Sequence, residues 1–529
     1  MSDRRFLEDL PRRIVIVGGG AAGWMAAALL ARCLKQAGTR VTVVEPPAER
    51  GLGVGEATIP SVLRLLANLG ADEAEMMRAC SATYKLGIQF ADWVRLERDS
   101  WHPFGVCGAR LDGRDLFPYW HAERIQGRLL RPYHSYSVHW AAALAGKGPY
   151  AEGGSPIADT RSYAFHMDAV AFATFLRERA LAEGVEAIEG AVASVGPNAT
   201  GGIAQVRLAD GRAVPGELFI DCTGFRAQLI GETLGDPFIS WNDRLLCDRA
   251  VATRIPTTRQ VAPYTKSTAL AAGWHWTIPL ASRTGVGYVY SSRHSGDDEA
   301  WEELRQSVGI GDSGDAAARA TPLFLKLRVG RQTSFWKANV VAIGLAAGFI
   351  EPLESTGLHL TQVAIEMLLE MLPDRRSPDL LRAAYNQRMG RIFDEVRDFV
   401  QLHYLASGRR DTAFWQEASA APASDALLGR LDVYDECGWL EDLVPEAFPD
   451  TSWFHILAGA GRLPRRPAPL TLAAPPERVQ GVLAAILRQN EQAVQALVPH
   501  RDLLERIHGS AGEPVAVPPA AAPTASRLV

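Results

Sequence analysis

The fold of this chain is decided by the stretch Arg13-Ile14-Val15-Ile16-Val17-Gly18-Gly19-Gly20-Ala21-Ala22-Gly23-Trp24. Ile14 to Val17 form a short apolar run, as expected of a parallel strand that is buried on both faces. Gly18, Gly20 and Gly23 then occupy the positions of a G-x-G-x-x-G pattern. The first glycine allows a tight turn, the second lets a pyrophosphate approach the backbone, and the third lets the next helix pack closely on the strand.

The residues that follow continue the same unit. A helix from Ala21 to about residue 36 presents free N–H groups and the positive end of its dipole to phosphate. A second strand over residues 40–44 ends at Glu45, at the distance from the glycines where an acid binds a ribose hydroxyl. The alternative is a glycine-rich turn in another strand–helix–strand unit. Because strand, helix and acid are in register, dinucleotide binding is favoured, although the pattern does not separate FAD from NAD.

Composition excludes several classes of function. The chain has 529 residues, too many for one ordinary domain, and its 22% of charged residues is typical of a globular enzyme. A net charge of −5 without a long basic run argues against binding to nucleic acid or to an anionic membrane. The six cysteines and twelve histidines show no metal-ligand spacing. We therefore expect no metal, and the reduced thiols of a cytoplasmic protein without signal peptide or membrane span.

Two further segments are candidate cofactor contacts. Residues 51–60 carry three glycines at alternate positions and include Ala57. Such a strap lets the backbone run close against a flat ligand, and a surface loop is the alternative. The buried strand over residues 217–220 ends at Asp221 before a glycine turn, which brings the chain near the dinucleotide a second time.

Residues 83–93 alternate between apolar and polar, as a half-buried strand does, and they include Lys85. Taken alone, a lysine on such a strand is usually on the solvated face. Trp274 and Trp276 lie two residues apart on another predicted strand, so both rings face the same side. They form either the wall of a site or part of the core.

A second glycine-rich turn follows the buried strand predicted over residues 339–343. It runs from Gly344 through Gly348 to Gly357 and contains two acids and two hydroxyl groups before a helix predicted over residues 361–372. A strand, such a turn and a helix N-terminus suit the binding of a small anion and the positioning of a carboxylate. The alternative is that Ser355 or Thr356 only caps the helix.

Beyond residue 378 the pattern becomes helical. Apolar residues at helical spacing predict a long amphipathic helix over residues 379–407, and a final helical region spans residues 476–508. The Ala/Pro-rich residues 509–529 have little to bury and are predicted to be disordered. We therefore divide the chain into a cofactor-binding module with an interleaved substrate sheet (residues 1–375), a mainly helical substrate-site region (376–508) and a tail.

Four of these motifs together resemble those of flavin-dependent halogenases of the tryptophan halogenase family. They are, beside the N-terminal glycine pattern, the strap Gly55-Glu56-Ala57-Thr58-Ile59-Pro60, the strand Tyr84-Lys85-Leu86-Gly87-Ile88-Gln89-Phe90, the pattern Trp274-His275-Trp276-Thr277-Ile278-Pro279 and the turn Pro352-Leu353-Glu354-Ser355-Thr356-Gly357. They occur in the family's order and cover nearly the whole predicted globular chain. The resemblance implies an α/β fold with an FAD-binding, Rossmann-like domain of the flavin monooxygenase type, an interleaved β-sheet and a helical C-terminal part.

The resemblance also implies a mechanism. Reduced FAD and O2 form a flavin hydroperoxide, which a chloride or bromide ion converts to hypohalous acid. The halide binds at the backbone of Thr356 and Gly357, the acid reaches Lys85, and Glu354 polarises the oxidant or removes the proton from the halogenated ring. The implied cofactor contacts are Gly18, Gly20, Ala21, Ala22, Gly23, Glu45, Ala57, Asp221, Gly344 and Gly348. The implied tunnel and substrate residues are His102, Phe104, Trp274, Trp276, Pro352, Ser355, Phe448 and Trp453.

The substrate class follows from a departure from the family pattern. Residues 447–455 are shorter and less rich in aromatic and amide groups than the segment that holds the amino-acid part of tryptophan in the family. We therefore expect a free indole or a similar small electron-rich aromatic. Without a second dinucleotide pattern, a separate NAD(P)H-dependent flavin reductase is expected to supply FADH2, and a homodimer stays open. The alternatives are a flavin-dependent aromatic hydroxylase and a non-catalytic flavin-binding paralogue.

Overall fold

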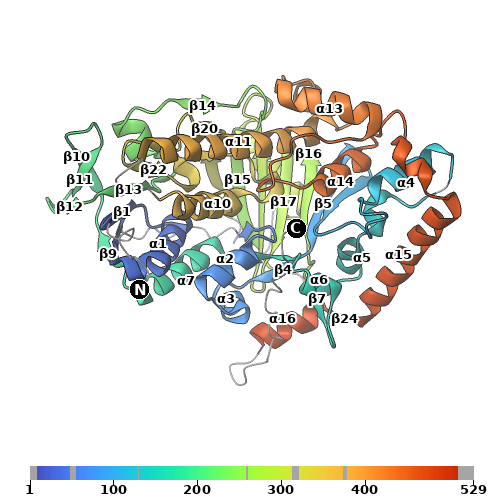
Figure 1. Ribbon diagram of the computed structural model, residues 1–529, viewed down its shortest axis with the longest axis horizontal. Coiled ribbons are helices and arrows are strands. Elements are labelled where there is room, and N and C mark those ends of the chain that lie inside the picture. Colours follow the sequence, from blue (N-terminus) through green and yellow to red (C-terminus); the bar gives the residue numbers. More distant parts are fainter. Residues whose placement is uncertain are drawn as a thin grey trace.

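The computed structural model describes residues 9–47, 55–128, 130–257, 260–311, 321–372 and 378–509. The start of the predicted strap, residues 51–54, and all of the predicted tail except Gly509 lie outside these residues. Two large sheets organise the chain, with helices packed around each of them (Figure 1). The α/β fold expected from the glycine pattern is confirmed.

A six-stranded sheet carries the N-terminal unit. Its strand order is β21 (Trp336–Lys337), β22 (Val340–Ala342), β13 (Leu218–Asp221), β1 (Arg13–Val17), β2 (Arg40–Glu45) and β9 (Glu186–Glu189). All pairs are parallel except β21 with β22. Ile14 to Val17 are buried within this sheet, as expected of a central strand of a parallel sheet.

Helix α1 (Ala21–Leu34) follows β1 and packs on α7 (Ala169–Ala182) and α10 (Gly357–Glu370). Its many small residues allow this close approach, and ten of its residues are buried. Gly23 shows why the last glycine of the pattern is required, because a Cβ atom there would lie 1.9 Å from the carbonyl oxygen of Gly18. This closeness fixes the N-terminus of α1 against the end of β1.

A seven-stranded sheet forms the middle of the molecule (Figure 1). Its order is β19 (Leu323–Lys326), β15 (Arg249–Ile255), β18 (Thr284–Tyr290), β17 (Gly273–Pro279), β16 (Thr265–Leu270), β5 (Gly87–Arg95) and β6 (Arg98–Pro103). Only β16 and β5 pair in parallel. The sheet joins segments far apart in the sequence, which is the interleaved arrangement that was expected.

The strand predicted over residues 83–93 is two strands. The N–H of Leu86 donates to the carbonyl oxygen of Pro263, and the chain changes sheet at this point. β4 (Thr83–Lys85) belongs to a small sheet with β8 (Ala164–Met167) and β3 (Glu56–Ala57), whereas β5 joins the large sheet. Lys85 therefore lies at the junction of two sheets.

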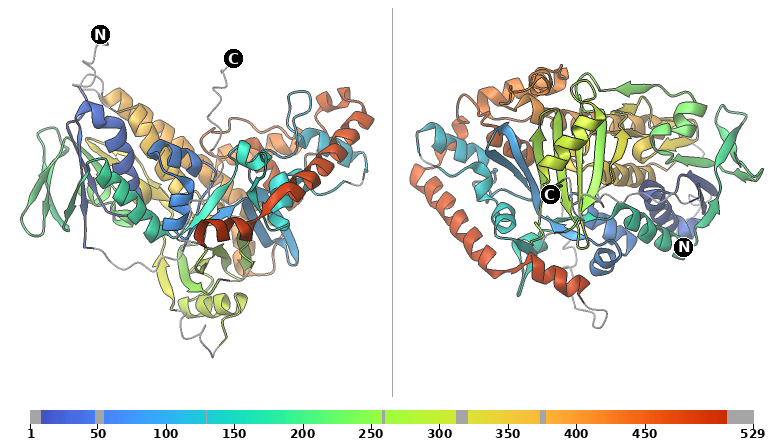
Figure 2. Two further views of the ribbon diagram at one scale, coloured as in Figure 1. Left: turned by 90° about the horizontal axis from the view of Figure 1, so that it is seen from below. Right: turned by 180° about the vertical axis from the view of Figure 1, so that it is seen from behind.

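The C-terminal part of the chain is mainly helical, and its long red helix lies on the side of the molecule opposite the N-terminal unit (Figure 2). The main helices of this part are α11 (Pro378–Leu405), α13 (Asp425–Cys437), α14 (Asp450–Ala460), α15 (Pro476–Ala496) and α16 (His500–His508). The last helical region is interrupted by β24 (Leu497–Pro499), which pairs with β7 (Lys147–Ala151). Helix α14 contacts β6, and this packing brings the C-terminal aromatic residues to the strand that carries His102.

Candidate active site

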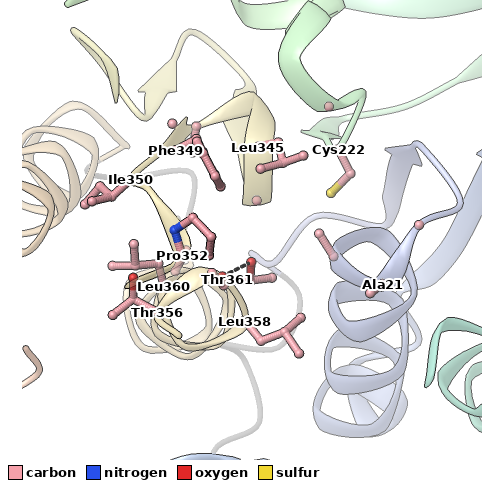
Figure 3. A pocket seen from close by; sticks show the side chains of 18 of the residues that line it. Ala21, Cys222, Leu345, Phe349, Ile350, Pro352, Thr356, Leu358, Leu360 and Thr361 are labelled. Atoms are coloured by element: carbon pink, nitrogen blue, oxygen red, sulfur yellow. Dashed lines mark hydrogen bonds between the residues drawn. The ribbon is translucent and has the colours of Figure 1, made fainter. Parts of the chain in front are cut away.

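A cavity of about 340 Å³ lies between the N-terminal ends of α1 and α10 (Figure 3). Figure 3 shows Ala21 on one side, Thr356 and Pro352 on the other, and Cys222 and Leu345 above. The predicted cofactor and halide residues that line it are Gly20, Ala21, Ala22, Gly344, Gly348, Thr356 and Gly357, and the predicted tunnel residue Pro352 lines it too. Two glycine-rich turns from distant parts of the sequence therefore face the same space.

Backbone space at the glycines fits a bound dinucleotide. A Cβ atom on Gly20 or on Gly357 would meet no atom within 4 Å among the described residues, so both backbones border open space. A Cβ atom on Gly18 would instead lie 2.2 Å from the carbonyl oxygen of Cys222, and Gly18 has a φ of +118°. Gly18 and Gly23 thus shape the turn, whereas Gly20 leaves the backbone N–H groups of α1 accessible to a phosphate.

Four predicted cofactor residues lie beside this cavity and do not line it. Gly18 and Gly23 are part of the turn below it, and Ala57 is buried in β3. Glu45 stands at the end of β2, where its carboxylate accepts hydrogen bonds from Trp24 Nε1 at 3.2 Å and Arg177 Nε at 3.2 Å. The carboxylate still lies at the position in the unit where a ribose would bind.

Asp221 is also outside the lining and is fully buried. Its Oδ2 accepts the backbone N–H groups of Leu229 at 2.7 Å and Ile230 at 2.9 Å, and its Oδ1 accepts the backbone N–H and the hydroxyl of Thr223. Four donors leave this carboxylate no free lone pair toward the cavity. Asp221 thus organises the turn after β13, while its neighbour Cys222 lines the cavity.

The turn between β23 (Gly348–Phe349) and α10 has an unusual backbone. After the short helix η7 (Pro352–Glu354), Ser355 adopts a left-handed conformation with a φ of +60°, which is rare for a residue other than glycine. Helix α10 begins at Gly357, four residues earlier than predicted, and the Thr356 side chain makes no capping hydrogen bond. The cap that was the alternative for Ser355 and Thr356 is therefore not formed by either hydroxyl.

Ser355 contacts the lysine of β4. Its hydroxyl accepts a hydrogen bond of 2.8 Å from Lys85 Nζ, and Nζ lies 5.3 Å from the centre of the Phe104 ring. Lys85 has no exposed surface, contrary to the solvated lysine that its strand pattern alone favoured. Burial lowers the pKa of Lys85 to about 7, although the negative charges of Glu354 and Glu56 raise it in part.

Glu354 is held between two histidines. His102 Nδ1 lies 2.8 Å from Oε2 and His403 Nε2 lies 2.8 Å from Oε1, both at hydrogen-bond distance, and the carboxylate is fully buried. Burial raises the pKa of Glu354, but the charge and hydrogen bonds of these histidines outweigh it and bring the pKa to about 2. The site therefore places an ionised carboxylate close to an amine that titrates near neutral pH.

Comparison with known proteins shows the family to which this chain belongs. The sequence profile of the family described as tryptophan halogenase matches residues 13–476. The chain belongs to the tryptophan halogenase family. SttH of Streptomyces toxytricini, a tryptophan 6-halogenase, is 36% identical over 90% of this chain and 94% of its own length. RebH of Lentzea aerocolonigenes, a tryptophan 7-halogenase, is 34% identical over 94% of this chain and 99% of its own.

Solved structures of flavin-dependent halogenases have the same fold. Xcc4156 from Xanthomonas campestris superposes with a TM-score of 0.88 at 37% identity, covering 94% of this chain and 98% of its own. BrvH from Brevundimonas sp. BAL3 superposes with a TM-score of 0.86 at 36% identity, covering 94% and 99%. The protein is thus an enzyme of the flavin-dependent halogenase class, which uses a flavin and a halide.

The aromatic residues of this halogenase gather around Glu354. The His102 ring lies 6.3 Å from Phe104 and 6.1 Å from Phe448, and the Phe399 ring stacks on Phe448 at 4.0 Å and lies 5.2 Å from Trp453. The predicted residues His102, Phe104, Phe448 and Trp453 therefore come together, and Phe399 joins them. Such a group of rings can enclose a flat aromatic substrate.

Trp274 and Trp276 lie side by side with ring centres 6.2 Å apart, as their spacing predicted. Trp274 also contacts Trp93, whose ring lies 6.2 Å from that of His403. The paired tryptophans thus border the site through Trp93. The indole nitrogen of Trp276 is buried without a hydrogen-bond partner among the described residues, whereas the Trp274 side chain interacts with the buried carboxyl group of Glu351.

Sequence reasoning missed three acidic or basic residues of the site. His403 is one of many polar residues on the long helix α11, and no motif contains it. Glu56 lines the cofactor cavity, and burial raises its pKa to about 7 despite the nearby charge of Lys85. Glu351 is fully buried, accepts a 2.5 Å hydrogen bond from the Tyr404 hydroxyl, and has a pKa that burial raises to about 7. Glu56 stood inside a quoted motif and Glu351 inside the predicted turn from Gly344 to Gly357, so their position was the only available signal.

No cluster of three or more metal-ligating side chains occurs in the part of the chain that the structure describes. Within the same residues, no helix is long and apolar enough to cross a membrane.

Proposed function

We propose that this enzyme halogenates a small, electron-rich aromatic of the indole type and that Lys85 delivers the halogen. The observation that carries the proposal is the turn at residues 355–356. Thr356 lines the cofactor cavity, whereas its neighbour Ser355 contacts Lys85 outside the cavity lining. One turn therefore connects the place where the oxidant forms with the lysine that would receive it.

Bound reduced FAD supplies, with O2 and halide, the hypohalous acid on which the reaction depends. The cavity between α1 and α10 would hold the flavin, with its pyrophosphate against the N–H groups after Gly20. The halide would bind to the N–H groups at Thr356 and Gly357, because the N-terminus of α10 carries unpaired donors and a partial positive charge.

Lys85 is suited to receive the oxidant. Since its pKa lies at about 7, a large share of the side chain is the neutral amine at neutral pH. The amine either hydrogen-bonds hypohalous acid or reacts with it, forming an N–halogen bond and releasing water. A carbon of the aromatic ring then takes the halogen as a cation equivalent. The lysine nitrogen keeps the electron pair and takes up a proton, equivalent to the one that the ring loses, which restores the amine.

Glu354 completes the reaction. Halogenation leaves a positively charged ring with one excess proton, and an ionised carboxylate is a sufficient base for so acidic a group. The hydrogen bonds from His102 and His403 keep this carboxylate ionised in a buried site. They also fix its orientation relative to the lysine.

The substrate class is supported by buried polar atoms near these rings. His455 lies 6.3 Å from His102 by ring centres, and neither of its ring nitrogens has a partner among the described residues. The same is true of Trp453 Nε1 and the Tyr133 hydroxyl. Because unpaired buried polar groups are costly, a substrate with an N–H group would satisfy one of them.

The decisive assay combines the protein with FAD, a separate flavin reductase, NADH and bromide or chloride. We expect halogenated indole by mass spectrometry, less product from tryptophan supplied in parallel, and none with Lys85→Ala. His294→Gln serves as the matched control and should retain activity. His294 pairs with Glu417 and is not one of the site residues. Product that persists in Lys85→Ala would remove this lysine from the mechanism.

Two further outcomes test the rest of the proposal. The purified protein alone should not consume NADH, because a separate reductase supplies FADH2. Hydroxylated product instead of halogenated product would favour the hydroxylase alternative. Reaction of tryptophan alone would show that the indole preference is wrong.

A further inference from the structure

His403 makes two hydrogen bonds that constrain its protons. Its Nδ1 lies 2.9 Å from the backbone carbonyl oxygen of Phe399, and its Nε2 lies 2.8 Å from Glu354 Oε1. A carbonyl oxygen only accepts, so Nδ1 carries a proton. The hydrogen bond between His403 Nε2 and Glu354 Oε1 contains one proton, which belongs either to the histidine or to the carboxyl group.

The second oxygen of the carboxylate decides between these two states. Glu354 Oε2 already accepts a hydrogen bond from His102 Nδ1 at 2.8 Å. A carboxylate that accepts two hydrogen bonds is stabilised in its ionised form. If Glu354 is ionised, then Nε2 of His403 is a donor too, and both ring nitrogens of His403 carry protons.

The surroundings of His403 agree with a charged pair. The imidazole is buried, with the Phe90 ring at 5.0 Å and the Phe399 ring at 5.2 Å. A buried carboxylate without a countercharge is strongly unfavourable, and Lys85 contacts Ser355 in place of Glu354. Both His102 and His403 contact the carboxylate directly, but only His403 has its other ring nitrogen fixed as a donor by a carbonyl oxygen among the contacts that the structure describes. The geometry therefore points to His403 as the charge partner of Glu354.

We propose that His403 is a cation in the resting enzyme and that it acts as a positioning residue. It forms a pair of zero net charge with Glu354, so that Glu354 does not require Lys85 as a countercharge. An amine must be unprotonated to take a halogen from hypohalous acid. A carboxylate without His403 would hold a proton on the lysine. The inference concerns the lysine mechanism proposed above and rests on it for its catalytic meaning.

Other titratable groups around the pair bear on this balance. They are Glu56 on β3, His166 on β8, His102 on β6, His455 on α14, and Tyr404 beside His403 with its partner Glu351. Burial keeps His166 and His455 neutral, since it brings the pKa of each well below its usual value. Neither supplies a positive charge near neutral pH, and thus neither replaces His403.

The charge of His403 can be measured directly. In the full chain with FAD bound and ¹⁵N-labelled histidine, we expect an imidazole with two protonated ring nitrogens at pH 7.5 whose signal vanishes in His403→Gln. Glutamine can still donate to Glu354 but carries no charge. A single protonated nitrogen in His403 would overturn the proposal.

Infrared spectroscopy gives a second measurement that does not require a His403 variant. If the shared proton were on Glu354, the wild-type spectrum would contain a protonated carboxyl band that is absent from Glu354→Gln. We expect no such band, and its presence would also overturn the proposal.

The consequence for Lys85 has its own test. The chain has six lysines, so ¹³Cε-labelled lysine gives a spectrum in which Lys85 is assigned by Lys85→Met. We expect the titration midpoint of Lys85 to rise by about one pH unit or more in His403→Gln, and to stay unchanged in the control His294→Gln. An unmoved or lowered midpoint would show that His403 does not set the lysine charge. None of these results depends on halogenation, so they remain valid if Lys85→Ala proves active and only the role of the lysine is wrong.

Discussion

Substitution of Gly20 should separate cofactor binding from folding. A Cβ atom on Gly20 meets no protein atom within 4 Å among the described residues, whereas one on Gly23 would lie 1.9 Å from the carbonyl oxygen of Gly18. Gly20→Val therefore places its side chain in the cavity, where the pyrophosphate would approach the N-terminus of α1. Loss of one charge-assisted hydrogen bond costs about 2 kcal/mol, which corresponds to roughly 30-fold weaker FAD binding.

Gly23→Ala provides the opposite case. Its methyl group overlaps the backbone of the turn, so the helix must move away from β1, and we expect a loss of stability of about 3 kcal/mol. The assays are flavin fluorescence titration for affinity and urea unfolding of the FAD-free chains for stability. Gly20→Val should match the wild type in unfolding within about 0.5 kcal/mol. Wild-type FAD affinity in Gly20→Val would refute the placement of the pyrophosphate.

Three further predictions concern buried charges. The pKa of Lys85 falls from 10.5 to about 7 on folding, so the stability of the wild type rises with pH between these values. Lys85→Met should be inactive, and urea unfolding should show it to be about 3 kcal/mol more stable than the wild type at pH 7. This difference in stability should vanish toward pH 10. The pKa of Glu354 is lowered from 4.5 to about 2, so its charge contributes about 3 kcal/mol above pH 4.5 that is lost as the pH falls to 2. The stability difference between wild type and Glu354→Gln should therefore shrink between pH 5 and pH 3, and a constant difference would contradict the assignment. Asp221→Ala leaves the N–H groups of Leu229 and Ile230 without their acceptor and should cost about 3 kcal/mol in the same assay, with FAD affinity of the folded protein unchanged.

Local patterns predicted the parts of the fold that depend on neighbours in the sequence. The strand, turn and helix around Gly18 to Gly23 formed as expected, because apolar periodicity and glycine conformations act over a few residues. The predicted long helix over residues 379–407 is also present as α11. The resemblance of four motifs correctly identified the family.

Predictions failed where a distant segment decides the environment. Lys85 has the pattern of an exposed residue, but β8 and the turn at Ser355 cover it. Helix α10 starts at Gly357 because the left-handed backbone at Ser355 ends the preceding turn early, which no propensity indicates. Asp221, which is predicted to contact the cofactor, accepts backbone N–H groups of the turn after it, and no local pattern indicates this contact.

The sequence by itself determined that a dinucleotide-binding unit stands near the N-terminus and that the chain carries the motifs of the tryptophan halogenase family, with Lys85 and Glu354 among them. Only the tertiary structure decided how these groups are charged. Glu354 is ionised because two histidines, one from β6 and one from α11, donate to it in a buried place, and Lys85 approaches neutrality because it is removed from water. The charge of a group in a protein interior depends on its burial and on partners distant in the sequence, and a local sequence pattern shows neither of them.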